Sequence, residues 1–122
     1  MSYVKKELNR FAVRLKLSWE GIRVTWAEEP SFPQWIIANI LSATMTFAFT
    51  MTPSERALII GFGLLVLVVE LLNTAVEAAI DLTIEEIHPL AKKAKDTACA
   101  AVALTAISTG VIWLLVVVPK FL

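Results

Sequence analysis

Three long apolar stretches are the feature of this 122-residue sequence that most limits what it can fold into. They run from about residue 34 to 51, from 57 to 80 and from 97 to 118. Each approaches the roughly 20 residues that a helix needs to cross about 30 Å of hydrocarbon. The chain is 57% hydrophobic and 18% charged, with a mean hydropathy of +0.71, which is unusual for a soluble domain. The sequence therefore predicts an all-α membrane protein with three transmembrane helices.

The residues before the first apolar stretch predict a helix of another kind. Apolar side chains recur there at helical spacing among basic ones: Leu8, Phe11, Leu15, Trp19, Ile22 and Trp26. This pattern is typical of an amphipathic helix in the membrane interface, with its tryptophans at the level of the lipid headgroups. We expect residues 1–29 to form this surface helix and residues 1–122 to make up a single domain.

The basic residues predict the orientation of the chain in the membrane. Nine of them would lie on one side of three spans: Lys5, Lys6, Arg10, Arg14, Lys16, Arg23, Lys92, Lys93 and Lys95. The other two, Arg56 and Lys120, would lie on the opposite side. Because lysine and arginine favour the cytoplasmic side, we expect the N-terminus in the cytoplasm and the C-terminus outside. The formal net charge of zero argues against nucleic acid as a partner.

Polar residues interrupt the second apolar stretch along one side of the predicted helix. At 100° per residue they fall within about 80° of one another: Glu70, Asn73, Glu77 and Asp81. An acidic side chain at the centre of a bilayer costs roughly 2.5–3.5 kcal/mol on insertion scales. This acidic stripe begins at the cytoplasmic boundary and ends near mid-membrane, since residues 57–69 carry no ionisable group. A channel would need polar groups along the whole path, whereas a site for a lipid headgroup and a cytoplasmic reactant would end at this depth.

Three interpretations of the acidic stripe remain open from the residues alone. The first is that the three acids hold helices together through interhelical hydrogen bonds. Each such bond stabilises a membrane protein by only about 0.6 kcal/mol, which is small compared with the cost of burying three acids. A proton-coupled transport element is the second interpretation. The third, a catalytic or metal site, is favoured because clustered carboxylates are oxygen ligands that Mg²⁺ accepts. Glu28 or Glu29, at the same predicted interface, would supply a partner for Glu77.

Basic residues near the cytoplasmic end of the stripe extend this third interpretation. Lys92, Lys93 and Lys95 lie at that end, and positive charge beside a carboxylate-bound metal suits phosphoryl transfer. Contact with anionic lipid explains Lys92 and Lys93 better than catalysis does. The four glycines fit neither a P-loop nor a protein-kinase glycine loop, so a bound nucleotide would not use those motifs.

Two motifs resemble the signature of a known family. ELLNTAVEAAID at 70–81, followed by HPLAKKAKD at 88–96, resembles the prokaryotic diacylglycerol kinase and undecaprenol kinase family. SWEGIRVTW at 18–26 and EEPSF at 28–32 resemble its surface helix and the segment before its first span. The resemblance extends from about Arg10 to Val118. It implies a homotrimer with active sites shared between subunits, in the inner (cell) membrane of a bacterium, with ATP as phosphate donor and Mg²⁺ as cofactor.

The resemblance also assigns roles by position. Glu70 corresponds to the general base that faces the lipid hydroxyl, with the catalytic Asn73 beside it, and Glu29 and Glu77 correspond to the metal-binding pair. The implied ATP-binding residues are Arg10, Ser18, Glu29, Glu77, Asp81, Glu86, Lys95 and Asp96. The implied lipid-binding residues are Glu70 and Trp113. Departures from the family pattern occur at Leu17, Pro33 and Trp35, where an aromatic residue, an arginine and an acid are usual.

The lipid substrate is harder to predict than the reaction. SWEGIRVTW resembles the diacylglycerol branch of the family, whereas HPLAKKAKD resembles the undecaprenol branch. Both lipids carry a primary hydroxyl, so the acidic stripe does not separate them. We expect phosphorylation of 1,2-diacylglycerol to phosphatidic acid, with undecaprenol as the alternative acceptor. A small ion-coupled transport or assembly subunit is the non-enzyme alternative, and it predicts flux or partner binding without ATP consumption.

Overall fold

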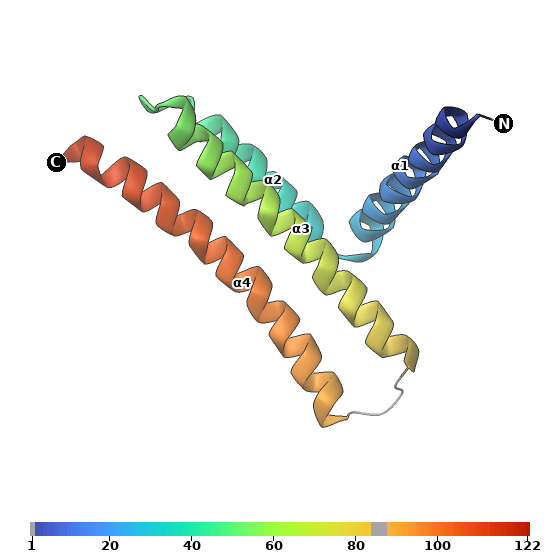
Figure 1. Cartoon of the computed structure of the whole chain (residues 1–122). Helices are drawn as coiled ribbons and strands as arrows, with labels where there is room; N and C mark the ends of the chain where they lie inside the picture. The colour runs from blue at the N-terminus through green and yellow to red at the C-terminus, as the bar shows by residue number, and fades with distance from the viewer. Residues whose placement is uncertain (1, 84–87) are drawn as a thin grey trace.

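The computed structural model describes residues 2–83 and 88–122, which form four α-helices and a short 3₁₀ helix (Figure 1). Their bounds are α1 Tyr3–Glu28, α2 Ser31–Met45, α3 Pro53–Thr83, α4 Pro89–Val117 and η1 Val118–Phe121. The long helices α3 and α4 lie side by side and antiparallel, and α2 lies against the first half of α3 (Figure 1). The predicted all-α fold is confirmed.

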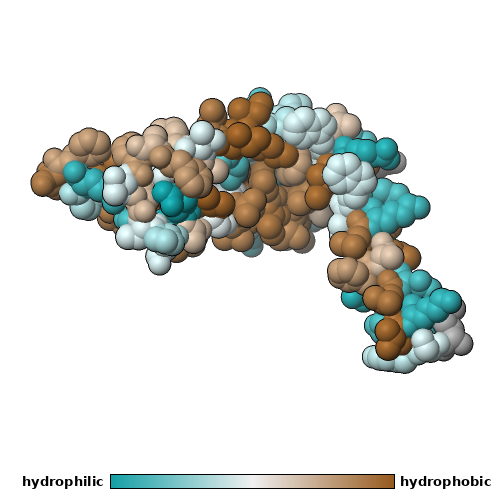
Figure 2. Space-filling view, turned by 90° about the horizontal axis from the view of Figure 1, so that it is seen from above, coloured by the Kyte–Doolittle hydropathy of each residue, from teal (hydrophilic) through white to brown (hydrophobic). Residues whose placement is uncertain are grey.

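Helix α1 stands apart from the other three helices. It begins with an N-cap in which the Ser2 hydroxyl accepts a hydrogen bond from the Lys5 backbone N–H at 3.3 Å. Its C-terminal end meets α2 and α3, whereas its N-terminal half points away from them (Figure 1). Figure 2 shows hydrophilic and hydrophobic residues on different sides of this arm. The helix thus has the position and the pattern expected of a surface helix over residues 1–29, and its location on a membrane stays a prediction.

Two helices of the described chain are long and apolar enough to cross a membrane, Pro53–Thr83 and Pro89–Phe121. Both extend beyond the predicted stretches at 57–80 and 97–118, because a hydropathy pattern marks the apolar part of a helix and not its ends. Large apolar side chains such as Leu64, Leu114 and Leu115 are exposed in the isolated chain. Exposed side chains of this kind suit helices surrounded by lipid or by other helices.

The first predicted span is shorter in the structure than in the sequence analysis. Helix α2 has 15 residues and ends at Met45, whereas the apolar stretch continues to residue 51. At 1.5 Å per residue, α2 is about 22 Å long, less than the hydrocarbon thickness of about 30 Å. The chain turns after Met45, and the hydroxyl of the C-cap residue Thr46 donates to the Ala43 carbonyl oxygen at 2.6 Å. A third transmembrane span therefore stays a prediction.

The far end of the bundle from α1 is held by polar contacts. Thr52 and Glu55 form a capping box at the start of α3, in which each side chain accepts a hydrogen bond from the other's backbone N–H at 3.1 and 2.9 Å. Glu55 also pairs with Lys120 of η1 at 3.3 Å. The guanidinium of Arg56 lies 4.4 Å from the centre of the Phe47 ring. These contacts join the N-terminal end of α3 to the C-terminus and to the residues that follow α2.

Helix α3 is buried along one narrow side: Ile59, Gly63, Val66 and Glu70. These positions recur every three or four residues, so they lie on one face of the helix. A Cβ placed on Gly63 would lie 2.2 Å from the side-chain oxygen of Asn39 in α2. Glycine at this position therefore allows α2 and α3 to approach closely.

Gly63→Ala tests this close approach. The added methyl group must displace the Asn39 side chain, which donates a hydrogen bond to the Trp35 carbonyl oxygen at 2.9 Å. Overpacking of this kind costs about 1–3 kcal/mol, so we expect a clear fall in the melting temperature of the detergent-solubilised protein. Gly61→Ala is the matched control, since nothing lies within 4 Å of its added Cβ in the chain. Equal melting temperatures for the two variants would contradict the prediction.

Candidate active site

Glu70 is the most deeply buried residue of the acidic stripe. Its side chain lies in the middle of α3 and is only 4% exposed. One carboxylate oxygen, Oε1, accepts a hydrogen bond from the hydroxyl of Ser31 at 2.7 Å. The carboxylate is therefore turned toward the start of α2 and not toward surrounding lipid. A buried carboxylate needs such a partner, because an unpaired charge in an apolar environment is strongly unfavourable.

Glu29 reaches the acidic stripe from the connection between α1 and α2. It caps the C-terminus of α1, where its backbone N–H donates to the Thr25 carbonyl oxygen at 2.9 Å. The pKa of Glu29 is raised, first by partial burial and then by the negative charges of Glu77, Glu70 and Glu28. The structure thus places Glu29 in the electrostatic field of both Glu77 and Glu70, although it lies more than 40 residues from them in the sequence.

Asn73 and Glu77 form the next part of the stripe. The Asn73 amide donates a hydrogen bond to the Glu77 oxygen Oε1 at 3.2 Å. The amide oxygen of Asn73 is buried, and no donor from the described residues reaches it. A buried oxygen without a donor is unfavourable unless a further group, such as a cation, completes its environment.

The oxygen atoms gathered here suit a hard divalent cation. Glu29 and Glu77 supply carboxylates and Asn73 supplies an amide oxygen, which are ligand types that Mg²⁺ accepts. The described residues contain no group of three Asp, Glu, His or Cys side chains arranged to hold a metal. The raised pKa of Glu29 reflects its partial burial and the repulsion among these acids.

Residues expected to handle ATP meet at one end of α3 and α4. Lys95 of α4 pairs with Asp81 of α3 at 2.6 Å, which joins two residues of the predicted set across the helices. Asp96 pairs instead with Lys92, one turn away on its own helix, at 2.5 Å. All four side chains are substantially exposed, so these ion pairs contribute little to stability.

Other residues of the predicted ATP set are not brought to the stripe within one chain. Arg10 pairs with Glu7 on α1 at 2.8 Å, on the half of the helix that points away from α3 (Figure 1). The Ser18 hydroxyl donates to the Arg14 carbonyl oxygen at 2.8 Å. Ser18 also lines a groove of about 630 Å³ between α1 and α3. Glu86 lies outside the described residues.

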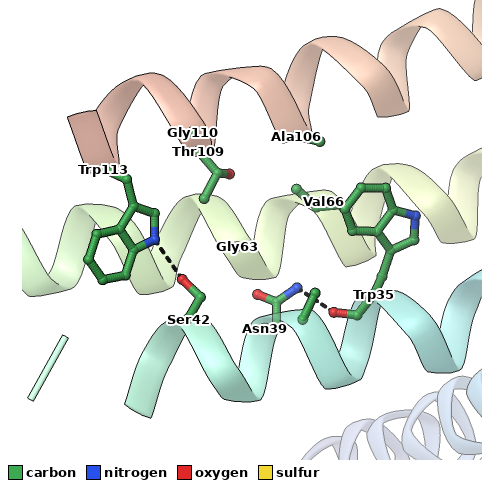
Figure 3. A pocket seen from close by; sticks show the side chains of 10 residues that line it. Trp35, Asn39, Ser42, Gly63, Val66, Ala106, Thr109, Gly110 and Trp113 are labelled. Atoms are coloured by element: carbon green, nitrogen blue, oxygen red, sulfur yellow. Dashed lines mark hydrogen bonds between the residues drawn. The ribbon is translucent and has the colours of Figure 1, made fainter. Parts of the chain in front are cut away.

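Trp113 lies in a separate pocket of about 180 Å³ among α2, α3 and α4 (Figure 3). Its indole N–H donates to the Ser42 hydroxyl at 2.8 Å. Trp113 and Trp35 lie at opposite ends of this pocket (Figure 3), and Val66 also lines it, four residues before Glu70 in α3. The expectation that Glu70 and Trp113 bind the lipid stays a prediction. Within one chain, Trp113 lies beside Ser42 and not beside Glu70.

Sequence reasoning missed Ser31 and Asn39 as members of these sites. Ser31 follows Glu29 by two residues, within the quoted EEPSF segment, and this proximity is a signal for it. Asn39 is a single amide in an apolar stretch, and only its contact with Gly63 reveals its position. Both residues lie on the side of α2 that faces α3.

The chain is similar to known proteins over most of its length. The model of the family described as prokaryotic diacylglycerol kinase matches residues 16–117. The chain belongs to the prokaryotic diacylglycerol kinase family. The resemblance noted in the sequence is thereby confirmed, and the chain is an enzyme of this family. The matched residues include the whole acidic stripe, Glu29 and Trp113, whereas Arg10 lies before them.

Relatives within the prokaryotic diacylglycerol kinase family carry two names. The diacylglycerol kinase of Escherichia coli (strain K12) is 34% identical over 104 residues, which cover 85% of each chain. The diacylglycerol kinase of Pseudomonas aeruginosa is 42% identical over 93 residues, 75% of this chain and 76% of the relative. The undecaprenol kinase of Bacillus subtilis (strain 168) is 36% identical over 118 residues, 95% of this chain and 94% of the relative. Family membership therefore leaves two lipid acceptors to be compared.

Proposed function

We propose that this protein is an integral-membrane lipid kinase that transfers the γ-phosphate of ATP to 1,2-diacylglycerol and so makes phosphatidic acid. The observation that carries the proposal is the buried carboxylate of Glu70, fixed by Ser31 and close to the acids Glu29 and Glu77. Relatives named diacylglycerol kinase match most of the chain at 34% and 42% identity. Membership of an enzyme family removes the support for the transport or assembly alternative.

The chemistry follows from the position of Glu70. Its carboxylate takes the proton of the lipid hydroxyl while that oxygen forms a bond to the γ-phosphorus of ATP. The bond between the γ-phosphorus and the β–γ bridging oxygen breaks, and ADP leaves. General-base catalysis by a positioned carboxylate is worth about 10²–10⁴ in rate. Asn73 holds Glu77 through its amide and keeps this part of the stripe in one arrangement.

Glu29, Glu77 and the amide oxygen of Asn73 would hold Mg²⁺ together with the phosphates of ATP. When bound, Mg²⁺ would neutralise negative charge on the phosphates of ATP. The protein's own contribution would be to hold the carboxylate of Glu29 near that of Glu77, whose negative charge contributes to the raised pKa of Glu29. Lys95, Asp81 and Asp96 lie at the cytoplasmic end of the stripe and would contact the nucleotide, with Arg10, Ser18 and Glu86 as further contacts.

We infer that the active form is a homotrimer whose sites are shared between subunits. The α1–α3 groove is open in the single chain, and Arg10 does not reach the acidic stripe of its own chain. Both observations fit a site completed by a second copy. The basic residues before α2 and near the start of α4 favour a cytoplasmic N-terminus and an external C-terminus in a bacterial inner membrane.

The test is phosphate transfer to defined lipids. Purified protein in mixed micelles receives Mg²⁺ and ATP labelled at the γ-phosphate, with 1,2-diacylglycerol and undecaprenol in parallel. We expect a larger kcat/KM for diacylglycerol than for undecaprenol. A preference for undecaprenol would favour the alternative, for which the match to the Bacillus subtilis relative over 95% of this chain is the supporting observation. Absence of label in any lipid alcohol would contradict lipid kinase activity.

A further inference from the structure

The hydrogen bond between Ser31 and Glu70 connects two parts of the chain that are 39 residues apart. Ser31 is the first residue of α2 and follows directly on Glu29 and Pro30. The short segment from Glu29 to Ser31 therefore contains both an acid of the proposed cation site and a hydrogen-bond donor to the proposed base, Glu70. The family resemblance assigns no role to Ser31.

The bond has the geometry of a strong interaction. The distance of 2.7 Å from the Ser31 hydroxyl oxygen to Glu70 Oε1 lies within the range of charge-assisted hydroxyl–carboxylate hydrogen bonds. Glu70 is nearly fully buried, and a low local dielectric strengthens such a bond. Within residues 2–83 and 88–122, no side chain or backbone group donates a hydrogen bond to the other carboxylate oxygen of Glu70, Oε2. One oxygen is thus engaged and the other is free to accept a proton.

We propose that Ser31 is a positioning residue for the reaction. Its hydroxyl fixes Oε1 of Glu70, so that Oε2 is the oxygen that takes the proton of the lipid hydroxyl. This inference rests on the proposed function of Glu70 as general base. Correct placement of a base is a large part of its catalytic value, because proton transfer needs hydrogen-bond distance and alignment.

The bond is not needed to hold α2 against α3. Phe32, the residue after Ser31, is buried at 2% exposure, and Ile59 of α3 is fully buried. Asn39 of α2 also contacts Gly63 of α3 closely. Removal of one hydroxyl therefore leaves these contacts in place and changes the freedom of the Glu70 side chain.

Ser31→Ala and Ser31→Thr test the inference by kinetics. We expect Ser31→Ala to lower kcat for lipid phosphorylation about tenfold, with the KM for Mg²⁺-ATP within twofold of the wild type. Ser31→Thr keeps the hydroxyl and should restore kcat to within about threefold. Ser108→Ala is the matched control, because the Ser108 hydroxyl donates only to the Leu104 carbonyl oxygen within α4. Its kcat should equal that of the wild type.

A second readout does not depend on activity. The ¹³C NMR signal of the Glu70 side-chain carboxyl carbon, assigned by its loss in Glu70→Gln, reports the hydrogen bonding of that group. We expect it to move in Ser31→Ala and to return in Ser31→Thr, while the carboxyl signal of Glu77 stays in place. Ser31→Ala with wild-type kcat, or a loss of kcat that Ser31→Thr does not restore, would overturn the inference while the proposed function stands. An inactive wild-type protein would overturn both.

Discussion

Glu70→Gln is expected to lower lipid phosphorylation by about 10²–10⁴-fold, the range typical of a lost general base. The amide has nearly the shape of the carboxylate and can still accept the hydrogen bond from Ser31. It cannot take a proton from the lipid hydroxyl. The measurement is kcat in mixed micelles, with circular dichroism and a melting curve to confirm the fold. The melting temperature should be unchanged or higher, because the substitution removes a buried charge.

Glu55→Gln is the control for this prediction. Glu55 lies on the same helix, at its opposite end, where it caps α3 and pairs with Lys120. Its replacement changes an acid of α3 without touching the stripe, so kcat should stay within about twofold of the wild type. Near-normal turnover of Glu70→Gln would show that another group accepts the proton.

Glu77→Gln is expected to give the second large effect, through cation binding. Loss of one of two carboxylates should raise the Mg²⁺ concentration for half-maximal activity at least tenfold and lower kcat by about 10² at fixed Mg²⁺. Glu29→Gln should behave in the same way. Since both acids are proposed to hold one cation, the double variant should lose less than the product of the two single effects.

The acid adjacent to this pair provides the matched control. Glu28 is exposed and adds only the smallest contribution to the raised pKa of Glu29. Glu28→Gln should change the Mg²⁺ requirement by less than threefold. A Mg²⁺ requirement that stays at the wild-type level in both Glu77→Gln and Glu29→Gln would contradict the proposed cation site.

The apparent Mg²⁺ affinity is expected to depend on pH in one direction. Burial and the neighbouring acids raise the pKa of Glu29, so it takes up a proton at a higher pH than an ordinary glutamate. A cation and a proton compete for the same carboxylate. As the pH falls through this raised pKa, the apparent Mg²⁺ affinity of the wild type should decrease, and Glu29→Gln should lack this component.

Much of the site was predictable because it lies on one helix. The period of 3.6 residues alone places Glu70, Asn73, Glu77 and Asp81 on one side, and the structure confirms contacts along it. The cost of a charge in an apolar stretch explains why Glu70 is turned inward and buried. Hydropathy predicted the two long helices but overestimated α2, because Phe47 and Phe49 are apolar yet lie beyond the helix end.

The contacts between helices could not be predicted from the sequence. Lys95 pairs with Asp81 and not with the adjacent Asp96, and Ser31 donates a hydrogen bond to Glu70. Gly63 leaves room for the side chain of Asn39. The sequence also did not predict that Trp113 lies beside Ser42 and not beside Glu70. Each of these pairs depends on how far one helix is shifted and rotated against another.

The sequence by itself thus determined the helical class, the acidic stripe and the family, because these depend on periodicity, hydropathy and motifs within short segments. Only the tertiary structure decided which oxygen atoms meet around Glu70 and how Glu29 joins them. The physical reason is the range of the forces. Helix periodicity is set by hydrogen bonds four residues apart, whereas the site is set by packing between segments about 40 residues apart, where a shift of one turn would exchange every partner.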